Sequence, residues 1–288
     1  MNCTLCPRMC AVDRENAQGY CGVGVNPVVA RVAPHYDEEP CISGTRGSGT
    51  VFFSGCPLGC AFCQNAEISH GCFGREIDIV GLRRAFEKLN DAGCHNINLV
   101  NPTHYAHTIL KALEPPLHVP VVWNSSGYER VETLRALEDR VQVFLPDLKY
   151  VDSALSARYS GAPDYFEFAS KALLEMYRQA GTPQLDDDGL IRRGLIVRHL
   201  ILPGCAQDSM RVLDWIAENL PGAWVSLMAQ YTPAGRASDF PEIDRRLTRK
   251  EYGRVVEHLF KLGLEEGYVQ ELSSADERYV PAFDLTGV

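Results

Sequence analysis

Short apolar runs alternate with longer amphipathic stretches from residue 50 onward. The runs are rich in Val, Ile, Leu and Phe and too short for typical helices, as expected of strands buried on both faces. They predict strands at 50–54, 96–100, 119–124, 141–148, 195–202 and 224–230. The chain shows no sequence repeat of 20–50 residues and no low-complexity segment.

The stretches between the strands place their apolar residues on one helical face. They predict helices at 79–92, 104–113, 129–138, 164–180, 208–220 and 248–264. Asp208 or Ser209 is the expected N-cap of the helix at 208–220. Thr248 precedes Glu251 by three residues, which is a capping-box pattern at the start of the last helix.

Alternating strands and helices predict an α/β fold built from parallel βαβ units. Six units fit either an open doubly wound sheet or a partial (β/α) barrel, and both place their chemistry at the carboxyl ends of the strands. Residues 1–49 lack this pattern and are expected to form an irregular, cysteine-bearing extension. The predicted domains are therefore 1–49, a metal-binding extension, and 50–288, the core.

Composition narrows the class of protein. Of the 288 residues 45% are hydrophobic, yet no apolar run approaches the roughly 18 residues of a membrane span. The first residues lack the features of a signal peptide, so a cytoplasmic location is expected. In that compartment the eleven cysteines indicate metal binding rather than disulfides. The net charge of −9 disfavours a nucleic-acid surface.

Three cysteines directly follow the first predicted strand, in the spacing Cys56-x3-Cys60-x2-Cys63. Gly55 and Gly59 make the segment a loop, which favours thiolates turned toward a metal over small buried hydrophobes. Zinc and an iron–sulfur cluster both accept thiolates. A four-iron cluster with three protein ligands leaves one iron open, and an open iron is a place for chemistry.

Four further cysteines form a complete set in the extension: Cys3, Cys6, Cys10 and Cys21. Four thiolates within so short a stretch predict a closed site with a structural or electron-relay role. Zinc and a second [4Fe-4S] cluster both fit this ligand set. The remaining cysteines are interpreted as ordinary core or loop thiols, with Cys41 as a spare ligand at most.

The triple-cysteine loop, with aromatic Phe62 before its last cysteine, resembles the CxxxCxΦC signature of radical S-adenosylmethionine (SAM) enzymes. The resemblance implies a partial (β/α)6 TIM-like barrel. It also implies a [4Fe-4S] cluster on Cys56, Cys60 and Cys63 whose open iron binds SAM, with Phe62 at the adenine. Reductive cleavage of SAM would give a 5′-deoxyadenosyl radical that abstracts a hydrogen atom from a substrate.

Residues 38–69 narrow the resemblance to PflX-type relatives of pyruvate formate-lyase activating enzymes. It implies two partners: an electron donor such as flavodoxin or ferredoxin, and a glycyl radical enzyme on which the radical is installed. Modification of a peptide or small molecule is an alternative. A non-catalytic zinc-binding interaction module is a third hypothesis, from a different class.

Two pairs of polar residues at strand ends resemble motifs of the activating enzymes. Asp147 and Lys149 match a D-x-K motif near the methionine part of SAM, and alternation puts both on one face of an extended segment. Asn124 and Ser125 stand where the activators carry acidic and hydroxyl ligands of a monovalent cation beside SAM. Because Asn124 replaces the acidic ligand of the activators, the sequence does not decide between a cation site and none.

Other strand ends supply further candidate SAM contacts. Where most radical SAM enzymes carry Gly-Gly-Glu, this chain has Asn101, Thr103 and His104, so one of these three would hold SAM, with approach to the substrate as the alternative role of His104. Arg198 resembles an activator arginine that points at SAM, and a charge inside an apolar run needs an anionic partner. The neighbouring His199 is expected to face the opposite way.

Overall fold

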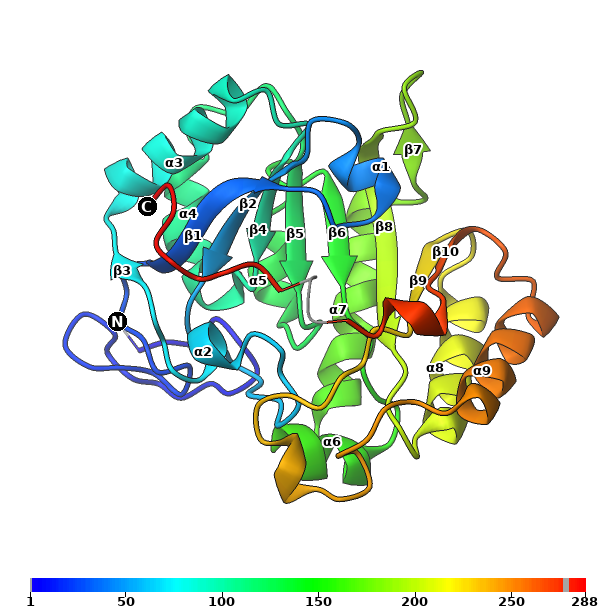
Figure 1. Ribbon diagram of the computed structural model, residues 1–288. Coiled ribbons are helices and arrows are strands. Elements are labelled where there is room, and N and C mark those ends of the chain that lie inside the picture. Colours follow the sequence, from blue (N-terminus) through cyan, green and yellow to red (C-terminus); the bar gives the residue numbers. More distant parts are fainter. Residues whose placement is uncertain (1, 277–279) are drawn as a thin grey trace.

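The computed structural model describes residues 2–276 and 280–288, and its centre is a curved, mostly parallel sheet (Figure 1). The parallel strands, in their hydrogen-bonded order, are β2 (Ser48–Phe53), β4 (Ile97–Val100), β5 (Val121–Ser125), β6 (Val143–Pro146), β8 (Ile191–Leu200), β9 (Trp224–Met228) and β10 (Gly267–Val269). All six predicted strands are confirmed. The sequence pattern does not predict β10, because three residues are too few to show a period.

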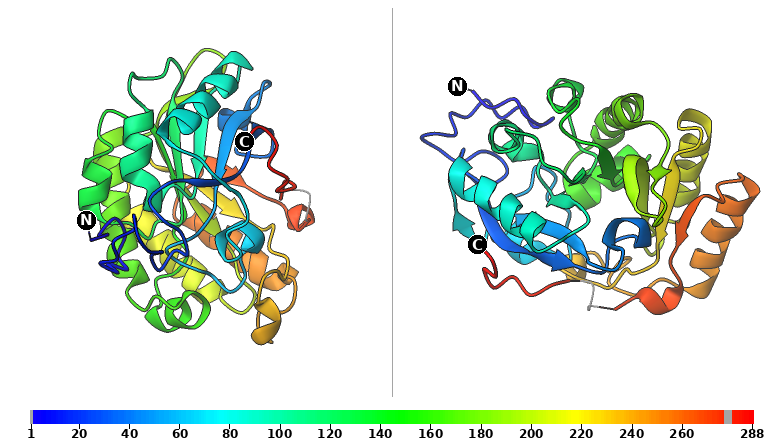
Figure 2. Two further views of the ribbon diagram at one scale, coloured as in Figure 1. Left: turned by 90° about the vertical axis from the view of Figure 1, so that its left-hand side faces the viewer. Right: turned by 90° about the horizontal axis from the view of Figure 1, so that it is seen from above.

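Helices cover the convex outer face of the sheet (Figure 2). They are α3 (Ile79–Asp91), α4 (Ala106–Ala112), α5 (Val131–Arg135), α7 (Tyr165–Ala180), α8 (Ala206–Asn219) and α9 (Arg249–Lys261), with the 3-10 turn η1 (Thr103–Tyr105) leading into α4. These are the six predicted helices. None of the helices in the described residues is long and apolar enough to cross a membrane.

The sheet is a partial barrel that does not close. At one edge β1 (Val28–His35) pairs antiparallel with β2, and β3 (Arg75–Glu76) pairs with β1, while β10 forms the other edge. The short β7 (Gln184–Leu185) pairs with β8 outside this order. The α/β partial (β/α)6 barrel is thus confirmed, with an antiparallel addition at its first strand.

The expected irregularity of residues 1–49 is wrong for their second half, which contains β1 and α1 (Pro40–Ser43). Cys41 and Ile42 of α1 pack against Val122, Val143 and Ile196 from the inside of the barrel. The apolar contact makes α1 a plug at the amino end of the strands and explains why Cys41 is a core residue. Residues 2–27 contain no helix or strand, and the domain boundary at residue 49 stays a prediction.

Local sequence patterns predict one helix cap correctly and another incorrectly. Thr248 and Glu251 form the predicted capping box of α9. The predicted N-cap of α8 is wrong, because the helix begins after Cys205. The Asp208 carboxylate instead accepts the backbone N–H groups of Val151 and Asp152 at 3.2 and 3.0 Å, and so fixes the loop that follows β6.

Four shorter elements complete the described fold. Of these, α6 (Ser153–Ser160) follows the β6 loop, and α2 (Ala66–Ser69) follows the triple-cysteine loop. The 3-10 turns η2 (Ala237–Asp239) and η3 (Leu272–Ser274) lie in the last third of the chain. The carboxyl-terminal segment runs beside β1, since Leu285 N–H donates to Ala30 and Val32 N–H donates to Thr286.

Candidate functional site

A cavity of about 420 Å³ opens inside the curve of the sheet, a volume in the range of small-molecule sites. It is lined by the three cysteines of the triple-cysteine loop and by residues at the ends of β4, β5, β6 and β8. Of the predicted SAM contacts, the lining includes Phe62, Asn101, Asn124, Ser125, Asp147, Lys149 and Arg198, but not Thr103. Side chains from distant parts of the chain thus meet at one place, although their roles stay predictions.

The triple-cysteine loop turns its sulfur atoms toward hydrogen-bond donors. The N–H of Leu58 lies 3.4 Å from Cys56 Sγ, and the Ser160 and Ser69 hydroxyls lie 3.1 and 3.2 Å from the sulfurs of Cys60 and Cys63. Such donors stabilise negative charge on sulfur and tune a bound iron–sulfur cluster. Burial raises the pKa of Cys60 to about 12, so its thiolate needs a bound metal.

The thiols of Cys56, Cys60 and Cys63 do not form a site for a single metal ion. Among residues 2–276 and 280–288, no three or more Cys, His, Asp or Glu side chains are close enough to hold a single metal ion. A four-iron cluster holds its cysteine ligands farther apart than one ion does. Three thiols that share a cavity and each meet a hydrogen-bond donor therefore fit a cluster with three protein ligands.

Asp147 is held between two cations in the cavity wall. Its carboxylate lies 2.6 Å from Lys149 Nζ and 3.5 Å from Arg198 Nε. Burial alone would raise the pKa of Asp147, but the charges of Lys149 and Arg198 outweigh it and hold that pKa below its usual value. The alternation that predicted Asp147 and Lys149 on one face is confirmed.

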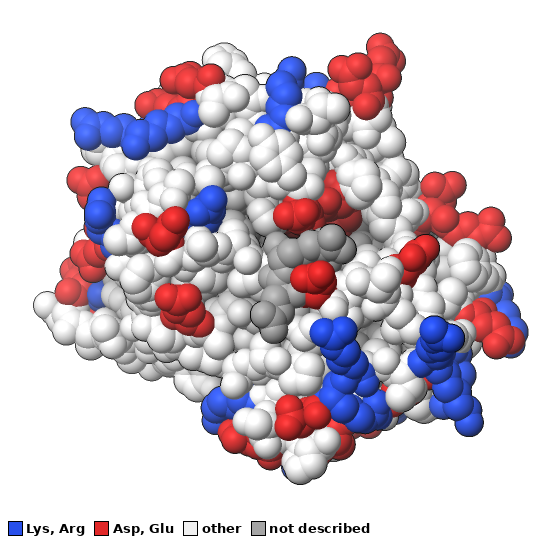
Figure 3. Space-filling model, viewed as in Figure 1, with Lys and Arg blue, Asp and Glu red and all other residues white. Residues whose placement is uncertain are grey.

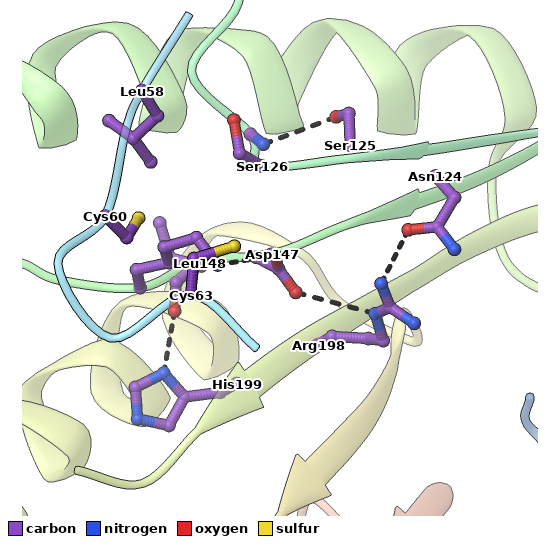
Figure 4. Close-up of polar contacts among 12 residues, drawn as sticks. Leu58, Cys60, Cys63, Asn124, Ser125, Ser126, Asp147, Leu148, Arg198 and His199 are labelled. Carbon is purple, nitrogen blue, oxygen red and sulfur yellow. Dashed lines mark hydrogen bonds and ion pairs between the residues drawn. The ribbon is translucent and has the colours of Figure 1, made fainter. Parts of the chain in front are cut away.

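Arg198 has the anionic partners that its apolar strand predicts. It forms an ion pair with Glu38 at 3.1 Å and donates to Asn124 Oδ1 at 2.5 Å (Figure 4). His199 turns to the opposite side, where Nδ1 donates to the Leu148 carbonyl at 2.7 Å. Burial lowers the pKa of His199 to about 4, so the ring is neutral and its role is structural.

Contrary to the prediction from the sequence, the residues that follow β4 do not all reach the cavity. Asn101 reaches it and Thr103 does not. Asn101 lines the cavity and donates to the Gly55 carbonyl at 2.6 Å, which ties it to the triple-cysteine loop. Thr103 is completely buried in η1 and does not reach the cavity, because the chain turns at Asn101, whose φ is +59°.

The expectation that His104 approaches substrate is wrong. Its ring lies outside the cavity lining, with Nε2 2.9 Å from the Ser54 carbonyl, and burial lowers its pKa to about 3.

The cavity lining includes residues that were not singled out from the sequence, among them Glu38 and Glu39. Glu38 accepts from Asn98 at 3.0 Å and from Asn124 at 3.4 Å, besides its ion pair with Arg198. Both acids lie before α1, in a segment whose sequence predicts neither a strand nor a helix. The adjacent Glu-Glu pair ahead of a proline, inside the segment that carries the family resemblance, was the one available signal.

Comparison with known proteins identifies a relative by sequence and solved structures that share the fold. No model of a protein family matches the chain. The uncharacterized protein MJ0674 of Methanocaldococcus jannaschii is 31% identical over 283 residues, which cover 92% of this chain and 76% of that protein. The chain belongs to the family of MJ0674.

Among solved structures, SuiB of Streptococcus suis shares the fold with a TM-score of 0.53. It was crystallised with the precursor peptide SuiA and with S-adenosylmethionine, at 15% and 16% identity to this chain. The match covers 76% of this chain, which spans about half the length of SuiB (48% and 49%). A likeness at this identity concerns the architecture of the barrel.

The cysteines of the extension lie close to one another and to the triple-cysteine loop. A Cβ on Gly19 would lie 3.4 Å from Cys21 Sγ and 3.5 Å from Cys10 Sγ, so both sulfurs flank this glycine. Burial, together with the neighbouring Cys3, Cys21 and Cys10, raises the pKa of Cys6 to about 12. The four predicted ligands therefore gather in one region.

The backbone joins the two cysteine groups directly. Cys56 N–H donates to the Cys21 carbonyl at 3.2 Å. Gly55 adopts φ +82°, and a Cβ there would lie 2.6 Å from the same carbonyl oxygen. Only glycine fits such a close approach in the left-handed region, so Gly55 permits the contact.

Arg8 clamps the triple-cysteine loop from within the extension. Its guanidinium donates to the carbonyls of Pro57 and Leu58, at 2.8 and 3.1 Å, which lie between the first two cysteines of that loop. It also donates to the carbonyls of Gly161 and Ser160, at 2.7 and 3.1 Å. One side chain thus fixes both the cysteine loop and the end of α6, whose Ser160 hydroxyl contacts Cys60.

Replacing Arg8 by Met is expected to loosen this loop. Loss of charge-assisted hydrogen bonds to four carbonyls should lower the free energy of unfolding by about 2–3 kcal/mol. The iron retained by the anaerobically reconstituted protein after gel filtration should fall at least twofold, roughly what a loosened three-ligand loop predicts. Arg84→Met is the control, because Arg84 is exposed. Unchanged iron and stability in Arg8→Met would show that the clamp is dispensable.

Proposed function

We propose that this protein is a radical SAM enzyme. The observation that carries the proposal is that the three thiols and the Asp147–Lys149 pair line the same cavity at the carboxyl ends of the strands. The signature spacing at 56–63 and the shared fold with a structure solved with S-adenosylmethionine support it. A charged cavity beside the thiols favours an enzyme over a zinc-binding interaction module.

In this proposal each group of residues that lines the cavity has a chemical role. Cys56, Cys60 and Cys63 would hold a [4Fe-4S] cluster that supplies one electron, received from a donor such as flavodoxin or ferredoxin, to cleave SAM into methionine and a 5′-deoxyadenosyl radical. Lys149 offers an ammonium group to the SAM carboxylate. Its positive charge also acts on Cys60 and Cys63 and counters the rise that burial causes in their pKa values.

Phe62 and the neutral polar residues complete the SAM site. The Phe62 ring packs against the rings of Tyr150, Tyr159 and Tyr231, with centroids 6.1–6.5 Å apart, and so presents a fixed apolar surface to an adenine. Asn101 and Ser125 supply hydrogen-bonding groups from neighbouring strand ends. Thr103 would not contact SAM. Its buried side chain would instead act indirectly, through the backbone of η1.

For the radical acceptor, we propose a glycyl radical enzyme, the partner implied by the resemblance to PflX-type relatives of activating enzymes. A partner activated in this way would carry a glycyl radical with an EPR doublet. Modification of a peptide is the second candidate, favoured by the shared barrel with SuiB, which was crystallised with a precursor peptide. A small-molecule substrate remains compatible with a cavity of about 420 Å³.

We further propose that Cys3, Cys6, Cys10 and Cys21 hold a second metal centre, either zinc or a [4Fe-4S] cluster. Like the thiols at 56–63, these four do not form a single-ion site among the described residues, which favours the cluster. The gathering of their thiols and the direct backbone contact between Cys21 and Cys56 support it. The centre would fold the irregular extension and so hold Arg8 against the triple-cysteine loop.

SAM cleavage tests the leading proposal. The reconstituted protein, reduced with dithionite under anaerobic conditions, should convert SAM to 5′-deoxyadenosine, and Cys60→Ala should lower that product at least 100-fold, on the order expected when a cluster ligand is lost. Cys94→Ala is the matched control, since Cys94 is buried outside the cavity lining and should leave the product unchanged. Equal product from Cys60→Ala and the unchanged protein would refute the assignment.

Metal analysis tests the second centre. Replacing Cys6 and Cys10 together by Ala should remove one metal centre while Cys56, Cys60 and Cys63 still bind theirs. Loss of about four irons per chain would identify a cluster, and loss of about one zinc would identify zinc. Iron and zinc contents equal to those of the unchanged protein would show that the extension holds no metal.

A further inference from the structure

The inner wall of the cavity is acidic beyond what SAM chemistry requires. Asp37, Glu38 and Glu39 line it together, all from the segment between β1 and α1. On the face of the molecule seen in Figure 1, acidic side chains are visible near the middle, while both acidic and basic ones are spread around the rim (Figure 3). The question is which of these acids already has a partner inside the protein.

Glu38 is fully partnered, but Glu39 is not. Glu38 accepts from three side chains, as described above, whereas Glu39 Oε2 is buried without a hydrogen-bond partner. The Glu39 residue is only 8% exposed, and Ser226 is a neighbour of its carboxyl group. A buried carboxylate oxygen without a donor is costly and is a mark of a site awaiting a ligand.

The charges around Glu39 do not balance. Three buried carboxylates, Glu38, Glu39 and Asp147, face two buried cations, Lys149 and Arg198. Lys149 pairs with Asp147, and Arg198 forms its ion pairs with Asp147 and Glu38, although its charge also acts on Glu39. Counted as ionised, the three acids exceed the two cations by one charge, and burial raises the pKa of both Glu38 and Glu39. A ligand that carries one positive charge and N–H donors would restore the balance.

Among the described residues, Glu39 forms no ion pair with a predicted SAM contact, although the charge of Arg198 acts on it. Its neighbour Ser226 stands inside β9, two residues before the end of that strand at Met228. Asp147 and Lys149, in contrast, lie beyond the end of β6 at Pro146. The cavity therefore runs from the thiols, past the lysine, to an acidic inner end that is available to a second molecule.

We propose that Glu39 binds a primary ammonium group of the substrate, and that the substrate is an amine. Glu38 sets the position of that group through the network it shares with Arg198. The ammonium group belongs either to a small amine or to a lysine side chain of a peptide, since both present the same chemistry. The inference rests on the proposed function, because it places the substrate beside bound SAM.

Titration with two ammonium probes tests this site. The SAM-loaded holoenzyme, without reductant, is titrated with n-butylammonium chloride, with N-acetyl-lysine methylamide, and with neutral 1-butanol, and binding is followed by calorimetry. Both ammonium probes, or one of them, should bind while 1-butanol does not. Tighter binding of the lysine derivative identifies a peptide source, and tighter binding of butylammonium identifies a small amine.

Variants then assign the binding to Glu39. Glu39→Gln should weaken binding of the ammonium probe at least tenfold, and Glu67→Gln, an exposed acid outside the cavity lining, should not. Because Glu39→Gln removes an unpaired buried charge, its melting temperature should equal or exceed that of the unchanged protein, so unfolding will not mimic the result.

Three results would overturn the proposal: no binding of either ammonium probe, equal binding in Glu39→Gln, or an equal loss of SAM affinity in that variant. The last result would assign Glu39 to the SAM site instead. The titration needs no electron transfer, so it is independent of SAM cleavage. Amine binding without 5′-deoxyadenosine formation would refute the proposed function alone, and the reverse result would refute the amine site alone.

Discussion

The buried ion network around Arg198 is the interaction on which the cavity depends. Arg198 stands in β8 and pairs with Asp147 beyond β6 and with Glu38 before α1, while it also donates to Asn124 of β5. Because β5, β6 and β8 are parallel neighbours, their ends meet at one edge and their polar residues reach one another. Removing one partner would leave a buried charge uncompensated, so the network also fixes the spacing of these strands.

The same network explains how a segment outside the strand–helix pattern becomes part of the site. The chain between β1 and α1 folds into the barrel because α1 buries Cys41 and Ile42 against its inner wall. This apolar contact brings Glu38 and Glu39 to the charged residues of the sheet. The extension is attached at the other end by Arg8 and by the Cys21–Cys56 backbone contact, so both halves of residues 1–49 hold cavity walls in place.

Much of this could be predicted from local patterns. Apolar runs buried on both faces revealed all six strands, and alternation placed Asp147 and Lys149 on one face. The spacing of the three cysteines after the first strand placed the candidate site correctly at the carboxyl ends. These features depend on residues near one another in sequence, which is why a single sequence reveals them.

The parts that could not be predicted depend on contacts between distant residues. Asp208 fits an N-cap pattern, but the N–H groups of Val151 and Asp152 compete for its carboxylate. His104 stands at a strand end like a site residue, yet the Ser54 carbonyl and complete burial take it out of the cavity. For Glu39 the sequence offers only a Glu-Glu pair ahead of a proline, and the folded chain alone shows that its Oε2 atom is buried without a hydrogen-bond partner.

The central claim is that Cys56, Cys60 and Cys63 hold a cluster with an iron open to SAM. The most direct measurement is electron–nuclear double resonance of the reduced protein with SAM labelled with ¹⁵N at its amino group, in a variant that lacks Cys6 and Cys10. The account predicts a ¹⁵N coupling that shows nitrogen bound to iron. A reduced cluster with no such coupling, at SAM concentrations that saturate binding, would contradict it.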